Sequence, residues 1–219
     1  MNSQQTNPKG MPMKKTAISL TTLLAAFFLV PLSAQQRPQP RPPGQAEAAA
    51  ANMINIRGVS TDSVFTPEFN YNLRGQSTRR DGRASWLQVS MEFDTAPNWI
   101  DEMTVTFYVV LRGNARDLPE GSPEVNMFSG SVTYMNVKQG RHIATMFLDP
   151  NTFERYGSPE GLAVTVQIDG TPAGGRVEPQ RTAESRWWTT QTPLPISLLR
   201  RDETPFALVE IEQNLTIKP

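Results

Sequence analysis

Residues Trp86 to Leu111 read WLQVSMEFDTAPNWIDEMTVTFYVVL, and this stretch decides the fold class. In both of its halves every second residue is apolar: Leu87, Val89, Met91 and Phe93, then Val105, Phe107, Val109 and Leu111. A period of two is typical of a β-strand with one buried and one solvated face. The stretch therefore predicts two strands, 87–93 and 105–111, in a β-sheet protein.

The same alternation recurs along the rest of the chain. It predicts further strands at Met53–Val59, Glu68–Leu73, Ser131–Val137, His142–Leu148, Leu162–Ile168, Ser185–Thr190 and Val209–Ile217. Turn sequences fall between them, at Asp81-Gly82, Arg112-Gly113-Asn114, Gln139-Gly140 and Gly174-Gly175. Strands with one apolar face pack sheet on sheet or close into a barrel, and uneven strand lengths favour an all-β sandwich here.

One short helix interrupts the strand pattern. Asp149 is a suitable N-cap, Pro150 suits the first helical position, and Gly157 can supply the stop with a positive φ. These three residues predict about two helical turns over Pro150–Tyr156.

The N-terminal 34 residues have the organisation of a secretory signal peptide. Lys14 and Lys15 precede an apolar run from Ala17 to Val30, which ends at Pro31 before the small residue Ala34. The run is too short to span a bilayer comfortably. Met13 is an alternative start to Met1. The sequence therefore predicts export, to the outer membrane, cell surface or medium, with the periplasm as the alternative.

Residues 35–51 read QQRPQPRPPGQAEAAAA and contain almost no large apolar side chain. Such a segment buries too little surface to order itself, so it is predicted to be a disordered spacer or a processing remnant. Residues 52–219 are then the folded β-sandwich domain.

Charge and cysteine content exclude several functions. Lys+Arg and Asp+Glu number 21 each, but three lysines and no acids lie in the predicted leader, so the exported chain is mildly acidic. Nucleic-acid binding is disfavoured because there is no basic field. The absence of cysteine excludes a thiol nucleophile, a thiolate metal site and a lipidated N-terminal cysteine. Membrane attachment is therefore expected only through a partner, and no cofactor or metal is expected.

The run from Trp86 to Leu111, followed by FSGSVTYMNVKQGRHIATMFLDPNTFERYG from Phe128 to Gly157, resembles the pilus-associated, immunoglobulin-like secreted proteins of verrucomicrobial gut commensals. The resemblance covers about Met53 to Pro219 and rests on the strand pattern. It implies an immunoglobulin-like β-sandwich at the cell surface, near type IV pilus-like machinery, with a role in adhesion or recognition by a host. Pilus components or host receptors would be its partners.

The chain departs from related groups in two ways. It has no paired cysteines, unlike antibody domains, and Gly10 is not followed by the acid-containing apolar helix of a true type IV pilin. An accessory component is therefore indicated rather than the shaft subunit. Because an immunoglobulin core needs only about 100 residues, the extra C-terminal strand near Phe206–Ile217 is expected to be an addition.

Residues suited to catalysis are few. His142 would have to be the base of any Ser-His-acid triad, but no G-x-S-x-G motif accompanies it, and it is predicted to be an exposed strand residue. Asp94, Asp101 and Glu102 could be glycosidase carboxylates, but are better explained as solvating a loop. Asp149 and its neighbours are explained by helix capping rather than calcium binding.

Tryptophan and arginine give the candidate contact residues. If Trp187 and Trp188 lie on a strand, one fills the core and the other stands on the surface, where it could stack on sugar rings or anchor a partner. Cover by the segment Thr192–Pro195 is the alternative. Trp86 and Trp99 are predicted to be core or core-edge residues. Arg79, Arg80 and Arg83 surround a hairpin tip that either binds an anionic partner, such as a sulfated glycan, or is merely solvated.

The sequence therefore favours a non-enzymatic, cell-surface structural or interaction protein that acts through loops and strand edges. The alternative is a carbohydrate-binding module for mucin-like glycans, which would use Trp187 or Trp188. The oligomeric state is left open.

Overall fold

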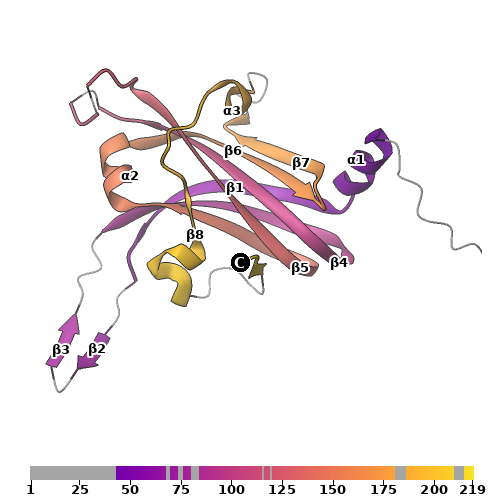
Figure 1. The fold of residues 1–219 in the computed structure, drawn as a ribbon, viewed down its shortest axis with the longest axis horizontal. Coiled ribbons are helices and arrows are strands. Elements are labelled where there is room, and N and C mark those ends of the chain that lie inside the picture. Colours follow the sequence, from indigo (N-terminus) through magenta and orange to yellow (C-terminus); the bar gives the residue numbers. More distant parts are fainter. Residues whose placement is uncertain are drawn as a thin grey trace, which may run out of the picture. The chain divides into compact units, whose positions relative to one another are not determined.

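The chain forms an all-β, sandwich-like domain, as the sequence predicts (Figure 1). The structure is a computed structural model that describes residues 43–219 apart from 68–69, 74–75, 80–83, 115, 119, 181–185 and 210–214. The predicted signal peptide therefore lies outside the described residues. The main sheet has seven strands in the order β7-β6-β4-β5-β8, with β1 on β4 and β9 on β5. β2 (Asn70–Leu73) and β3 (Gln76–Arg79) form a separate hairpin.

Two long strands organise the main sheet. β4 (Ser85–Arg112) contains both strands predicted within Trp86–Leu111, and β5 (Val125–Leu148) contains those predicted at 131–137 and 142–148. The predicted turn at Gln139-Gly140 is wrong, because β5 continues through it opposite Thr95 and Trp99 of β4. Between these two pairs β4 has three residues and β5 only one, so a bulge bends both strands without breaking them.

The bend divides the sheet into two arms. β1 (Ile54–Phe65) pairs with β4 before the bulge, whereas β6 (Ser158–Ile168) pairs with it after the bulge. β7 (Thr171–Glu178) adds to β6 and ends this arm. The apolar faces of the two arms enclose one core that includes Phe93, Phe107 and Tyr134, all fully buried. Each such side chain contributes about 1.5–3 kcal/mol by leaving water.

Buried polar groups hold the bend. Thr95 Oγ1 donates to the carbonyl of Lys138 (2.8 Å), and the backbone N–H of Gly140 donates to Thr95 Oγ1 (3.0 Å). His142 lies opposite Phe93, and its ring stands 5.4 Å from the Phe93 ring. Nε2 of His142 lies 2.7 Å from the Lys138 carbonyl and must carry the proton, because a carbonyl oxygen only accepts. The prediction that His142 is exposed is therefore wrong, since it is 6% exposed.

The predicted helix is confirmed as α2 (Pro150–Tyr156). Oδ1 of Asp149 accepts from the N–H groups of Asn151 and Thr152, each at 3.1 Å. Gly157 has the expected positive φ, 83°.

A second helix lies where a disordered spacer was predicted. α1 (Pro43–Ala51) contains five alanines, all in its AEAAAA end, and alanine has the highest helix propensity. Ala50 packs into the core at 5% exposure, and α1 contacts β7. The spacer prediction is wrong for these nine residues because tertiary packing orders them.

The C-terminal region is less regular than predicted. The segment near Phe206 forms the 3-10 helices η2 (Arg201–Glu203) and η3 (Pro205–Leu208), because Pro205 fixes a helical φ and the Thr204 hydroxyl accepts from the N–H of Phe206. Of the predicted C-terminal strand Val209–Ile217, residues 210–214 lie outside the described residues, and Thr216–Ile217 form β9. β8 (Leu199–Arg200) adds a short edge to β5.

Candidate functional site

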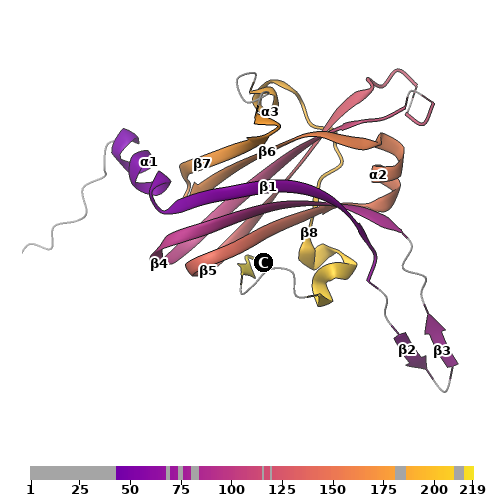
Figure 2. The ribbon, with the colours of Figure 1, turned by 180° about the vertical axis from the view of Figure 1, so that it is seen from behind.

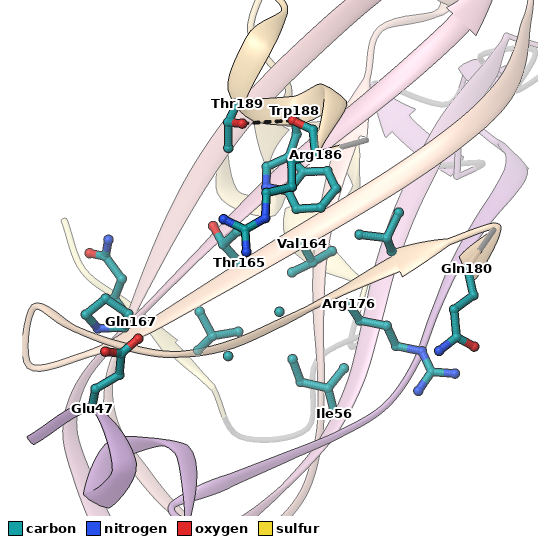
Figure 3. Close-up of a pocket in the computed structure, with 15 residues that line it drawn as sticks. Glu47, Ile56, Val164, Thr165, Gln167, Arg176, Gln180, Arg186, Trp188 and Thr189 are labelled. Atoms are coloured by element: carbon teal, nitrogen blue, oxygen red, sulfur yellow. Dashed lines mark hydrogen bonds between the residues drawn. The ribbon is translucent and has the colours of Figure 1, made fainter. Parts of the chain in front are cut away.

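A groove of about 740 Å³ runs along β7 (Figure 3). We call it the β7 groove. It is lined by Glu47 of α1, Ile56 of β1, residues 164–167 of β6, Pro172 and residues 174–177 of β7, Gln180, Arg186, and Trp188 and Thr189 of α3. Apolar side chains lie in its centre and charged side chains stand around it (Figure 3). The groove therefore combines an apolar centre with charged side chains, and it is the candidate site of this domain.

Two glycines shape the floor of the β7 groove. The sequence predicts a turn at Gly174-Gly175, but both residues lie within β7, and the β6–β7 turn is at Asp169 and Gly170 instead. Gly174 has a φ of 147°, which side-chain-bearing residues rarely adopt. A Cβ on Gly175 would lie 2.7 Å from the Val164 carbonyl oxygen. Glycine is thus required at both positions, and β7 presents bare backbone to the groove there.

β7 is an edge strand. Within the part of the chain that the structure describes, it pairs only with β6. Pro172 and the bulge at Val166/Gln167 disrupt pairing at the hairpin end of the edge, as natural edge strands commonly do. Residues 173–178 contain no proline, so each carries a backbone N–H and C=O, and on this edge they form no ladder with another described strand, although α1 and β1 contact β7.

The two tryptophans lie on a helix and not on the predicted strand. Arg186 adopts a left-handed backbone (φ 42°), after which α3 (Trp187–Thr190) makes a single turn. Both indoles are half-buried and meet edge to face with centroids 5.8 Å apart. Trp187 packs over Gly161 of β6, whereas Trp188 lines the β7 groove. The candidate anchor is therefore Trp188, and the prediction of one buried and one exposed tryptophan is wrong.

Arg176 and Arg186 of the β7 groove make no ion pair with any described residue, which is also true of Arg116 and Arg155. Other arginines do pair with acids: Arg57 with Asp94, Arg112 with Glu160, and Arg141 with Glu92. Sequence reasoning missed both groove arginines. The available signal was the pair of glycines in a strand, which marks close backbone approach.

The other candidate residues do not converge on a reactive site. Asp94 is paired with Arg57, and Glu102 is paired with Lys218 Nζ at 2.5 Å. Nδ1 of His142 has no hydrogen-bond partner among the described residues and is sealed in the core. The described residues contain no group of three metal-binding side chains.

Five further residues singled out in the sequence are two tryptophans and three arginines. Trp86 is buried (9% exposed), as predicted, but Trp99 is 58% exposed, so the prediction that it is a core residue is wrong. Arg80 and Arg83 lie outside the described residues, and only the backbone of Arg79 is described, in β3.

Comparisons with known proteins extend this description. A family model matches residues 45–218, which is most of the chain. Three chains of solved structures match, among them the crystal structure of a protein from the verrucomicrobial gut commensal Akkermansia muciniphila. That protein is 20% identical, with a TM-score of 0.58, and the match covers 76% of this chain and 93% of the other. No curated protein matches the chain.

The structural likeness shows a shared fold with a protein of the predicted bacterial group. It leaves the pilus association as a prediction. None of the helices within the described residues is long and apolar enough to cross a membrane.

Proposed function

The chain belongs to the family whose model spans residues 45–218, and from that premise we propose that it is a non-enzymatic surface protein that binds an extended segment of a partner protein along β7. The free edge of β7, opening into the β7 groove beside Trp188, is the observation that carries the proposal.

Strand addition fits this edge physically. A segment that pairs with an edge strand gains affinity from main-chain hydrogen bonds and specificity from alternate side chains. The bare backbone at Gly174 and Gly175 lets such a segment approach without a steric barrier. On one side of β7 its side chains would meet Trp188, and on the other they would meet Ile56 and Val164. Trp188 would anchor it, since a half-buried indole gives a large contact area at low entropic cost.

The cellular setting follows from the sequence. The signal-peptide pattern of residues 1–34 supports export, and the resemblance to pilus-associated secreted proteins supports a place near type IV pilus-like machinery, in adhesion or host recognition. The match to a protein of A. muciniphila agrees with the bacterial group that this resemblance implies. Attachment to the outer membrane would be through the partner.

Photo-crosslinking on intact cells tests this function. A benzophenone amino acid is placed at Gln180, which is exposed and lines the β7 groove, or at the control position Asp117, which is exposed in the β4–β5 loop. We expect one cell-surface protein to be captured from position 180, not from 117, and to be lost in Trp188→Ala. Recovery of pilus components would support the pilus setting. Equal capture from both positions would contradict docking in the groove, and capture of soluble periplasmic proteins alone would contradict the surface setting.

Glycan binding is the second candidate function. Trp188 lies beside Arg186, which forms no ion pair with a described residue, and this pair suits an acidic sugar because an indole face stacks on sugar rings and a guanidinium group binds carboxylates and sulfates. A glycan array probed with the whole exported chain and with Trp188→Ala decides this. Binding that disappears in the variant would favour the glycan, and absence of binding to every glycan would exclude it.

A further inference from the structure

We propose that the β7 groove selects a partner segment with opposite charges at its two ends: an acidic residue where it meets Arg176 or Arg186, which lie on opposite sides of β7, and a basic residue where it meets Glu47. This inference rests on strand addition along β7, the function proposed above. It specifies which segment binds and in which direction it runs.

Among the described residues, no acid forms an ion pair with Arg176 or Arg186 in the positive part of the groove. Arg176 lies opposite Val164, an apolar residue, so its neighbour on β6 offers no charge. Glu178 is on the same face of β7 two residues further on, yet it forms no ion pair with Arg176 and lines the adjacent groove beside β1. Arg186 stands beside Trp188 (Figure 3). Arg176 and Arg186 lie on opposite sides of β7, so a ligand carboxylate would meet one or the other of them, and neither guanidinium group forms an ion pair with a described residue.

The negative part of the groove is at the opposite end of β7. Glu47 is the single acidic residue of α1, is exposed, and makes no ion pair with a described residue. α1 lies at the hairpin end of β7, where the strand begins (Figures 1 and 2). In Figure 3, Glu47 and Gln167 stand at one end of the groove and Arg176 and Gln180 at the other. β7 therefore runs from the acidic end of the groove to the basic end.

This polarity predicts the order of charges in the ligand. All strand pairs of the main sheet are antiparallel, and antiparallel ladders are slightly more stable per residue. A segment added antiparallel to β7 runs from the arginines towards Glu47. Its acidic residue is then N-terminal to its basic residue, and about four to six residues separate them at strand spacing.

The charges act on selection more than on affinity. Exposed ion pairs are weak, so each is expected to change the dissociation constant about two- to fivefold. Charges at the rim of an interface mainly set register, exclude wrong partners and accelerate encounter. Reversing both ends of the ligand should therefore weaken binding about tenfold, because attraction becomes repulsion at each end.

Selection from displayed peptides tests the inference on the whole exported chain. Random nine-residue peptides are selected against the wild type, Trp188→Ala, the double variant Arg176→Glu/Arg186→Glu, and Glu47→Lys. Arg116→Glu is the matched control, since Arg116 is exposed on the loop before β5, away from the groove. We expect the wild type and the control to enrich peptides with Asp or Glu near the N-terminus and Lys or Arg near the C-terminus. The arginine variant should lose or reverse the first preference, and Glu47→Lys the second.

The other outcomes separate this inference from the function it rests on. Enriched peptides that need Trp188 but show no charge order, or the same order on every variant, overturn the charge selection and leave strand addition intact. The reverse charge order overturns the antiparallel direction. No enrichment on any of the proteins, or enrichment unaffected by Trp188→Ala, overturns strand addition itself. Circular dichroism of each variant confirms that the exposed substitutions leave the fold unchanged.

Discussion

Two aromatic clusters cover the outer face of this sheet. One is closed to solvent, and the other is partly open to it. At Trp86, the ring of Phe206 stands edge to face at 5.8 Å from the indole and stacks on Phe147 at 4.5 Å, and all three side chains are buried. At Trp188, the indole meets only Trp187 edge to face, and its free side lines the β7 groove. Both sites use aromatic residues from an irregular segment laid over strands.

The difference lies in how the covering segment is held. η3, which carries Phe206, begins with the Thr204 cap. The preceding turn is closed by Glu203, whose Oε2 accepts from the backbone N–H of Arg200 at 2.8 Å and whose Oε1 lies 3.7 Å from Arg200 Nε. α3 has one turn and no side-chain cap at Arg186. Beneath Trp86 are bulky side chains, whereas beneath α3 are Gly161 and other small residues of β6. A tryptophan in the sequence thus does not reveal its role. Whether a tryptophan is buried depends on how firmly the covering segment is held and on how large the neighbouring side chains are.

The largest expected effect separates the two clusters directly. Phe206→Ala should lower the free energy of unfolding by about 3–5 kcal/mol, because it removes a buried ring that fills the space between Trp86 and Phe147. Trp188→Ala should cost less than about 1.5 kcal/mol, since its indole is half-exposed. Urea unfolding followed by circular dichroism measures both. A comparable loss in Trp188→Ala would show that this residue is structural and would remove the reason for assigning it a partner.

A smaller effect tests the floor of the β7 groove. Gly175→Ala should destabilise the protein by about 1–3 kcal/mol, because the new Cβ would lie 2.7 Å from the Val164 carbonyl oxygen and push β7 from β6. Gly58→Ala in β1 is the matched control, since a Cβ there meets nothing within 4 Å. Urea unfolding should show little change for the control. Equal stabilities of the two variants would mean that β7 can shift freely and that the groove has no fixed shape.

The sequence predicts the regular part of this fold well for a physical reason. Alternation in β4 and β5 records which side faces the core, and that pattern survives the bulge at Thr95–Trp99. Caps such as Asp149 act within one turn, so they too can be read locally. Most of the candidate site depends on contacts that are distant in sequence. Arg176 comes from β7, Arg186 directly precedes α3, and Glu47 comes from α1, so these residues line one groove only in the folded chain. No local sequence pattern indicates this arrangement.

His142 and the tryptophan pair show the same limit. A turn sequence, Gln139-Gly140, precedes His142, yet the strand continues through it and the histidine is buried by the bend it stabilises. Trp187 and Trp188 follow a strand-like alternation, but a left-handed Arg186 begins a helix there. In both places a single backbone conformation overrides the local pattern.

The cap of α2 gives a further contrast with the uncapped α3. Asp149→Ala should lower the free energy of unfolding by about 1 kcal/mol, since two backbone N–H groups lose their acceptor. Asp117→Ala, an exposed acid in the loop before β5, is the control and should change stability little. Urea unfolding distinguishes the two. No loss in Asp149→Ala would show that packing alone fixes α2, and that the missing cap does not explain the openness of α3.

The smallest expected effect separates a paired arginine from the unpaired arginines of the β7 groove. Arg112 donates from Nη2 to Glu160 Oε2 at 3.1 Å, and this hydrogen bond, together with charge attraction, holds the pKa of Glu160 below its ordinary value of 4.5. A lowered pKa in the folded state means that the pair stabilises the protein above about pH 4.5. That contribution disappears as the pH falls through the lowered pKa, when the carboxylate takes up a proton.

Glu160→Gln should therefore be slightly less stable than the wild type at pH 7 in low salt, and the difference should vanish in acid. Arg176→Gln, which breaks no ion pair among the described residues, should show no such pH-dependent difference. Urea unfolding of all three proteins from pH 7 to pH 3 makes the measurement. A pH-dependent loss in Arg176→Gln equal to that in Glu160→Gln would show that Arg176 already has an acidic partner, and the groove would then have no free positive charge to offer a ligand.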